Sequence, residues 1–145
     1  MKNPKISIIT VIKNNKEYIE KNILSLINQN YKNYEHIIID GESTDGSKEI
    51  IQDYRQNIAH FVSEKDQGIY DAMNKGIDLA SGDIIGILNS DDYFYEDALQ
   101  IVKAYFETMP KIDFLFGSVH KHIIKHGFYP KKIFWTFNFY SSHSI

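Results

Sequence analysis

Carboxylate side chains follow three of the short apolar stretches of this 145-residue chain. Asp40 ends the run HIIID, Glu64 and Asp66 stand in the segment VSEKDQG, and Asp91 and Asp92 follow the run IIGILNS. If these stretches are parallel strands of one sheet, their carboxyl ends meet at a single edge, where open α/β sheets bind ligands. Carboxylates gathered there repel one another unless a cation or hydrogen-bond donors balance them. A hard divalent metal ion with a bound diphosphate satisfies this requirement.

A simpler interpretation is that acids placed after strands only cap the helices that follow. We prefer that interpretation for Asp45 and Asp97, which precede segments of helical period. It does not account for Asp91 and Asp92, because the next helical segment begins several residues later. These two residues are therefore the first candidates for a metal site.

The elements that must position these side chains alternate along the chain. Runs of β-branched residues alternate with segments of helical period, which predicts an α/β fold with a mostly parallel sheet flanked by helices. Strands are predicted at Ile6–Ile12, His36–Ile39, His60–Ser63, Ile84–Leu88 and Phe114–Val119. Helices are predicted at Lys16–Asn28, at Asp45–Asn57, around Ile69, Met73, Ile77 and Ala80, and around Leu99, Val102 and Phe106. Gly82 stands where the end of a helix often requires a positive φ.

The composition excludes several classes of partner. With 19 acidic and 16 basic side chains the net charge is −3, which provides no basic surface for nucleic acid. There is no cysteine, so a metal must be held by oxygen or imidazole ligands, and oxygen ligands favour magnesium, manganese or calcium. The apolar run Ile6–Ile12 is too short for a membrane span or a signal peptide, which predicts a cytoplasmic protein.

Motifs of other nucleotide-binding proteins are missing. The segment TVIKNNKEY after the first predicted strand has no GxGxxG, so a dinucleotide oxidoreductase is not expected, and the absence of GxxxxGK[ST] excludes a P-loop. A phosphotransfer domain would carry an acidic nucleophile at the end of the first strand, where Thr10 and Asn14 stand instead.

Four segments, in order, resemble the signatures of family 2 glycosyltransferases. They are ISIITVIKNN, HIIIDGESTDGS, EKDQGIYDAMNKGI and SGDIIGILNSDDYF, and together they span Ile6 to Phe94, roughly two thirds of the chain. The resemblance implies a Rossmann-like GT-A fold, of which the chain forms the part that binds the nucleotide sugar. It also implies a divalent metal, Mn²⁺ or Mg²⁺.

The resemblance implies roles for individual residues. Small polar groups of the first strand line the base and ribose, Asp40 bonds the nucleobase, Asp66 lies near the nucleotide, and the next helix turns a polar face to the sugar. Binding of the sugar donor is thus expected at Thr10, Asn14, Asp40, Asp66, Asp71, Asn74 and Asp91, and binding of the metal at Asp91 and Asp92. Many relatives have Asp where this chain has Asn89, so Asp91 is assigned to the ribose or the metal.

The implied reaction is the inverting transfer of a hexose or N-acetylhexosamine to a saccharide or lipid-linked glycan in surface polysaccharide biosynthesis. A UDP-sugar is the favoured donor, and a GDP-sugar is the other. A carboxylate base should deprotonate the acceptor, but no residue is assigned to it and it can lie beyond Ile145; His143 is expected on the acceptor side. The first alternative is a nucleotide-sugar-binding fragment without transfer activity. A nucleotidyltransferase is disfavoured, because no glycine-rich loop is visible near the N-terminus.

The C-terminal segment is unusually aromatic, with five aromatic residues in the seven from Phe134 to Tyr140. We interpret residues 1–145 as one glycosyltransferase domain that is incomplete at its C-terminus; alternatively, the rings pack on the sheet of a compact protein. With Lys131 and Lys132, these rings also allow contact with the inner face of the membrane, although a core or a homo-oligomer interface explains such clusters more often. The histidines of HKHIIKH fit no metal-binding spacing.

Overall fold

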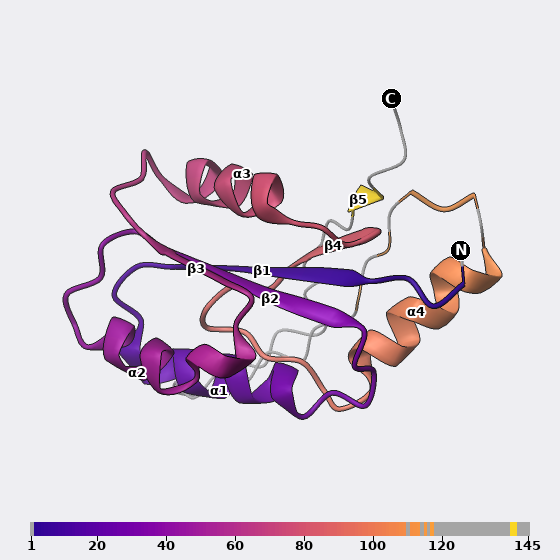
Figure 1. Cartoon of the computed structure of the whole chain (residues 1–145), viewed down its shortest axis with the longest axis horizontal. Coiled ribbons are helices and arrows are strands. Elements are labelled where there is room, and N and C mark those ends of the chain that lie inside the picture. The colour runs from indigo at the N-terminus through magenta and orange to yellow at the C-terminus, as the bar shows by residue number, and fades with distance from the viewer. Residues whose placement is uncertain (1, 110, 114, 116, 118–139, 142–145) are drawn as a thin grey trace, which may run out of the picture.

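The computed structural model describes residues 2–109, 111–113, 115, 117 and 140–141, and all structural statements below concern these residues. The strands are β1 (Ile6–Ile12), β2 (Tyr34–Asp40), β3 (His60–Ser63), β4 (Ile84–Ile87) and β5 (Tyr140–Ser141). The helices are α1 (Lys16–Ile27), α2 (Ser47–Asp53), α3 (Ile69–Leu79) and α4 (Ala98–Thr108), with a short 3₁₀ helix at Arg55–Asn57. The sheet has the order β3-β2-β1-β4-β5 (Figure 1). Its first four strands are parallel, and β5 runs antiparallel to β4.

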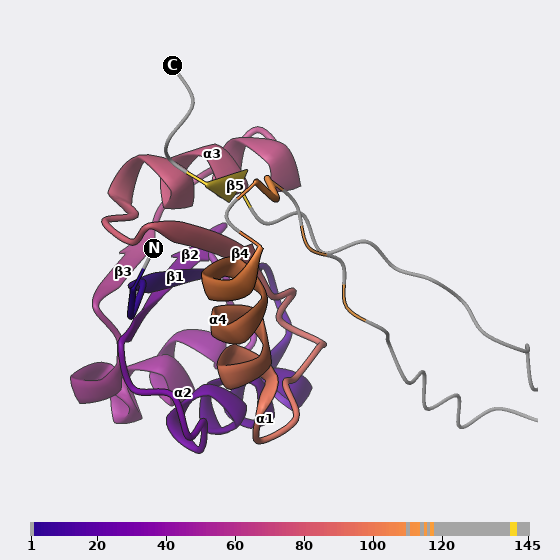
Figure 2. The same ribbon diagram turned by 90° about the vertical axis from the view of Figure 1, so that its right-hand side faces the viewer.

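Helices cover both faces of the sheet, with α3 on one face and α1, α2 and α4 on the other (Figures 1 and 2). All seven residues of β1 are buried, as expected of a parallel strand between two helical layers. Successive side chains of β1 point to opposite faces, so Ile9 joins the cluster under α3 whereas Ile8 and Ile12 join the clusters under α1, α2 and α4. The predicted α/β fold with a mostly parallel sheet is therefore confirmed.

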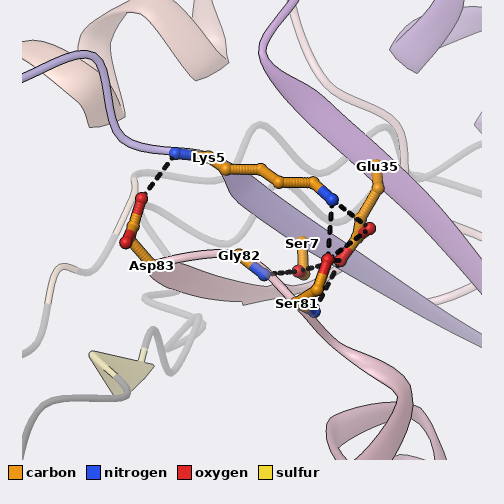
Figure 3. Close-up of polar contacts among 6 residues, drawn as sticks. All are labelled: Lys5, Ser7, Glu35, Ser81, Gly82 and Asp83. Atoms are coloured by element: carbon orange, nitrogen blue, oxygen red, sulfur yellow. Dashed lines mark hydrogen bonds and ion pairs between the residues drawn. The ribbon is translucent and has the colours of Figure 1, made fainter.

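A polar network lies at the end of the sheet where β1, β2 and β4 begin (Figure 3). The Glu35 carboxylate is 8% exposed and accepts hydrogen bonds from Lys5 Nζ (2.6 Å), Ser7 Oγ (2.6 Å) and the backbone N–H of Ser81 (2.7 Å). Burial alone would raise the pKa of Glu35, but these hydrogen bonds outweigh it and lower the pKa to about 2. The network ties the segment that leads into β4 to β1 and β2.

Gly82 adjoins this network, and the position requires glycine for a reason that the sequence did not reveal. The helix α3 ends at Leu79, and the next residue, Ala80, has an extended conformation (φ −69°); among the glycines that the structure describes, those with positive φ are Gly46 and Gly68. The expectation of a positive φ at Gly82 is therefore wrong. A Cβ atom on Gly82 would instead lie 2.7 Å from the carbonyl oxygen of Lys5 and 2.7 Å from the backbone nitrogen of Ser7, so the position requires glycine because two backbones meet there.

The two acids expected to act as helix caps differ. Asp45 accepts from the backbone N–H of Lys16 (2.8 Å) and of Ser47 (3.0 Å), the first residues of α1 and α2, which confirms its capping role. Asp97 stands at the N-cap position of α4, but its carboxylate makes no capping bond and accepts from Asn30 Nδ2 (2.7 Å). The capping interpretation is thus wrong for the Asp97 side chain.

Other predictions fall on the C-terminal part of the chain. Within the predicted strand Phe114–Val119 the structure describes Leu115 and Gly117, and neither lies in a strand. The rest of that strand, the histidines of HKHIIKH, the aromatic segment before Tyr140 and His143 lie outside the described residues. In the described part of the chain, no helix has the length and apolarity needed to cross a membrane.

Candidate functional site

An open cavity of about 510 Å³ lies at the carboxyl ends of β1 and β4, beside the beginning of α3. The polar residues around it are Lys13, Asp66, Asn89, Ser90 and Asp91, and β1 and α3 contribute its apolar wall. This is the edge at which ligands bind in open α/β sheets. Two residues predicted to bind the sugar donor, Asp66 and Asp91, therefore line the same cavity.

The loop that follows β4 carries the acidic pair. It turns tightly, with the backbone N–H of Asp92 donating to the carbonyl of Asn89 (3.0 Å), and Asn15 Nδ2 donates to Ser90 Oγ (2.8 Å). Burial and the negative charge of Asp91 raise the pKa of Asp92, against a weaker opposing hydrogen bond from Asn89. The loop thus holds two neighbouring carboxylates, and neither forms an ion pair with a side chain that the structure describes.

Asn89 offers a further oxygen at this loop. Its Nδ2 group is 3.4 Å from Asp92 Oδ2, whereas its buried Oδ1 atom has no hydrogen-bond partner among the described residues. A buried acceptor without a partner is costly, unless a bound group satisfies it. Within the described residues no three His, Asp or Glu side chains form a ready-made metal site. Two carboxylates and an amide oxygen are nonetheless hard ligands, and they fit Mg²⁺ or Mn²⁺.

Asp66 is held over a glycine. Its Oδ1 atom accepts from the backbone N–H of Gly68 (3.0 Å), and a Cβ atom on Gly41 would collide with its Oδ2 atom. The same Cβ would lie 3.4 Å from Cδ of Lys13, so Lys13 and Asp66 both adjoin Gly41. Sequence reasoning missed Gly41 and Lys13; the available signal was their place directly after β2 and β1, at the edge of the sheet where the ligand was expected.

Asp40 and Thr10 lie behind the cavity and do not line it. The Asp40 carboxylate is fully buried and accepts from the backbone N–H of Ser43 (3.1 Å) and from Ser63 Oγ (2.6 Å), so it joins the loops after β2 and β3. Thr10 is also fully buried, with its hydroxyl 2.9 Å from Nε2 of His36. Burial lowers the pKa of His36 to about 3, so this imidazole is neutral near pH 7.

The remaining predicted residues lie outside the cavity lining. Asn14, with a positive φ of 52°, accepts from the backbone N–H of Thr44 (2.8 Å) and so connects the loops after β1 and β2. On α3, Asp71 accepts from the backbone N–H of Gln67 (3.0 Å) and pairs with Lys75 (3.3 Å), which together lower the pKa of Asp71. Asn74 is exposed on the same helix.

Known proteins match this chain over much of its length. The model of glycosyl transferase family 2 matches residues 7–144. An uncharacterized glycosyltransferase of Haemophilus influenzae is 42% identical over 103 residues, which cover 69% of this chain and 41% of that protein. TuaG of Bacillus subtilis, named for teichuronic acid biosynthesis, is 35% identical over 100 residues, which cover 67% of this chain and 40% of that protein. The match thus spans about two fifths of the length of these relatives.

Solved structures share the arrangement of strands and helices. S. aureus TarS 1–349 in complex with UDP-GlcNAc has a TM-score of 0.66 and 25% identity, covering 72% of this chain and 31% of that one. The mannosyltransferase PcManGT from Pyrobaculum calidifontis in complex with GDP-Man and Mn²⁺ has a TM-score of 0.65 and 25% identity, covering 70% and 32%. The predicted GT-A fold is thereby confirmed, and the chain belongs to glycosyl transferase family 2.

Proposed function

We propose that this chain binds a nucleoside-diphosphate sugar together with a divalent metal in the cavity beside the loop after β4, and transfers the sugar to a glycan acceptor. The observation that carries this proposal is the unpartnered Oδ1 atom of Asn89 next to Asp91 and Asp92, because a cation would satisfy this buried oxygen and balance the two carboxylates. TarS with UDP-GlcNAc and PcManGT with GDP-Man and Mn²⁺ support the same class of ligand.

In this proposal Asp91 and Asp92 hold the metal, with the Asn89 side-chain oxygen beside them. Bound there, Mn²⁺ or Mg²⁺ supplies charge neutralisation for the departing diphosphate. Lys13 brings a positive charge to the same cavity, and Asp66 brings acceptor oxygens for N–H or O–H groups of the nucleoside. Asp71 and Asn74 on α3 remain proposed contacts of the sugar donor. For Thr10, Asn14 and Asp40, which were expected to bind the donor as well, we propose an indirect role through the strands and loops that they connect, because Thr10 and Asp40 are fully buried and Asn14 bonds the loop after β2.

The chemistry that we propose is direct displacement with inversion at the anomeric carbon. A base must accept the proton of the acceptor hydroxyl, and none of the described residues is assigned to that role. The sugar is a hexose or N-acetylhexosamine, carried by UDP in preference to GDP, and His143 belongs to the acceptor side. The acceptor is a saccharide or lipid-linked glycan of a surface polysaccharide, in line with the teichuronic acid biosynthesis for which TuaG is named. We place the reaction at the cytoplasmic face of the membrane, with self-association allowed.

Calorimetric titration with UDP and GDP, each with and without Mn²⁺, tests this function. We expect binding that strengthens at least tenfold with Mn²⁺, followed on the same sample by slow hydrolysis of the matching sugar donor. Binding without hydrolysis or transfer would favour the fragment that binds nucleotide sugar but does not react. No binding of either nucleotide would contradict the proposal.

A further inference from the structure

The helix α1 turns three polar side chains toward the loop that carries the acidic pair. Asn22, Ser25 and Gln29, the last of these two residues beyond the helix, are spaced three and four residues apart and so lie on one side of it. Asn22 and Gln29 are 1% and 0% exposed, and we call these three residues the α1 seam. Buried polar side chains in such positions are costly unless they are hydrogen bonded, so their partners indicate their role.

Every partner of the α1 seam on this loop is a backbone group. Asn22 Nδ2 donates to the carbonyl oxygens of Asn89 (2.8 Å) and Asp92 (3.0 Å). Ser25 Oγ accepts from the backbone N–H of Phe94 (3.1 Å). At the far end, Gln29 Nε2 donates to the carbonyl of Tyr95 (2.7 Å), and Gln29 Oε1 accepts from the backbone N–H of Leu99 (3.0 Å). The seam therefore supplies hydrogen bonds that this irregular, partly exposed loop does not make by itself.

The orientation of the Asn22 amide is set by a hydrogen bond from Thr10 on β1. Both N–H groups of Asn22 face carbonyl oxygens, so its Oδ1 atom must accept, and Thr10 Oγ1 lies 3.3 Å away as the donor. The Thr10 oxygen then accepts from Nε2 of His36, 2.9 Å away. A buried chain of hydrogen bonds thus leads from β2 through β1 and α1 to the two carbonyl groups that bracket Asp91.

We propose that Asn22 is a positioning residue for the cation site, because its amide holds the two peptide groups between which Asp91 and Asp92 are presented. This inference rests on the proposed function. It also gives Thr10 a role different from contact with the sugar donor, since Thr10 orients the amide of Asn22. Ser25 and Gln29 hold the part of the loop that carries no proposed ligand, so the two ends of the α1 seam should affect metal binding differently.

The test compares Asn22→Leu with Gln29→Met, two substitutions of similar size. Asn22→Leu removes the hydrogen bonds to the carbonyls of Asn89 and Asp92, and Gln29→Met removes one to the carbonyl of Tyr95 and one from the N–H of Leu99 at the beginning of α4. For each variant, the affinity for UDP is measured by calorimetry in Mn²⁺ and in EDTA, and amide hydrogen exchange of residues 89–94 is measured without ligand. We expect Asn22→Leu to lower the Mn²⁺-dependent gain in UDP affinity by roughly tenfold or more, and to leave the affinity in EDTA within about twofold. Exchange at residues 89–94 should rise by a similar factor.

The control Gln29→Met should change the Mn²⁺-dependent gain by less than about threefold, although it lowers the stability of the chain as well. Equal effects of the two variants on this gain, or wild-type exchange at residues 89–94 in Asn22→Leu, would overturn the inference. If the wild-type chain shows no Mn²⁺-dependent binding, the proposed function fails, and the exchange measurement still decides the positioning role. Should Asn22→Leu not fold, Thr10→Val removes the hydroxyl behind Asn22, and we expect about a threefold loss of the Mn²⁺-dependent gain.

Discussion

The two ends of the parallel strands differ in how their acidic side chains are hydrogen bonded. At the amino-terminal edge, Glu35 is surrounded by donors from Lys5, Ser7 and Ser81, and its pKa is lowered to about 2 (Figure 3). At the carboxyl-terminal edge, burial and the neighbouring Asp91 raise the pKa of Asp92. An acid with several donors from the protein stabilises the fold, whereas Asp92, with one long hydrogen bond from Asn89 (3.4 Å), keeps lone pairs for a ligand. This contrast distinguishes the amino-terminal, structural edge from the carboxyl-terminal, functional edge, where we propose that the ligand binds.

The largest expected effect comes from removing the acid at the functional edge. Asp92→Asn should abolish Mn²⁺-dependent binding of UDP or GDP, a loss of more than about a hundredfold. Groups that only hydrogen bond to a metal ligand already change metal affinity by about 10- to 100-fold, and a residue that binds the metal directly should matter more. Its stability should not fall, since the substitution removes a repulsive charge. Calorimetry and urea unfolding measure the two quantities.

The matched control is Asp97→Asn, which changes an exposed acid of the same loop whose carboxylate bonds Asn30. This variant should bind both nucleotides as the wild type does. Equal losses in the two variants would mean that the loop as a whole, and not the acidic pair, determines binding.

Removing the acid at the structural edge should have the reverse result. Because the pKa of Glu35 falls from 4.5 to about 2 on folding, its contribution to stability is complete above about pH 4.5 and is lost as the pH falls through about 2. Glu35→Gln should lower the free energy of unfolding at pH 7 by roughly 3 kcal/mol and flatten its dependence on pH between 4.5 and 2. Urea unfolding across this range checks both effects, and Mn²⁺-dependent binding by the folded variant should be retained.

A pair of glycines extends the comparison. A Cβ on Gly82 would meet backbone atoms of Lys5 and Ser7, which cannot move cheaply, so Gly82→Ala should lower stability by about 2 kcal/mol. A Cβ on Gly41 would collide with the end of the Asp66 side chain, which can move, and would be in ordinary contact with Lys13 Cδ, so Gly41→Ala should cost less than about 1 kcal/mol. It should nonetheless weaken nucleotide binding severalfold by displacing Asp66. Thermal unfolding and calorimetry on both variants would contradict the comparison if the losses were reversed.

The smallest expected effect concerns Lys13, the lysine that lines the cavity. Lys13 lines the cavity from the loop after β1. Lys13→Met keeps the length of the side chain and removes its charge, so we expect roughly a threefold loss of UDP affinity that disappears at high salt. A partly exposed lysine outside this cavity is changed in the control, Lys48→Met on α2. A loss that does not depend on salt would assign Lys13 a packing role.

The strands and helices could be predicted closely, because local pattern determines them. The predicted ranges Ile6–Ile12 and His60–Ser63 coincide with β1 and β3. For β1 the reason is its continuous β-branched run, which is typical of a buried parallel strand. The predicted helix Asp45–Asn57 was too long at both ends. Its true beginning depends on Gly46 with φ 98°, and its end on a 3₁₀ turn, which are properties of chain geometry and not of apolar spacing.

The individual roles of site residues were harder to predict. Motif spacing brought Asp66 and Asp91 to one cavity, as expected of residues that follow parallel strands. The same reasoning did not reveal that Asp40, which ends β2, and Thr10, which lies within β1, are fully buried and do not line the cavity, because the sequence pattern is identical for a side chain that faces inward. Nor did it reveal Asn22, which belongs to a helix far from the acidic loop in sequence.

By itself, the sequence determined the alternation of strands and helices, the absence of thiolate ligands, and the arrival of carboxylates at one edge of the sheet, because these depend on residue types and short periods. Only the tertiary structure decided which acids are supplied with donors. Glu35 obtains its hydrogen bonds from residues up to 46 positions away, whereas the side-chain Oδ1 atom of Asn89 obtains none among the described residues. Hydrogen bonding and burial depend on contacts between distant segments, and these contacts form only when the chain is folded.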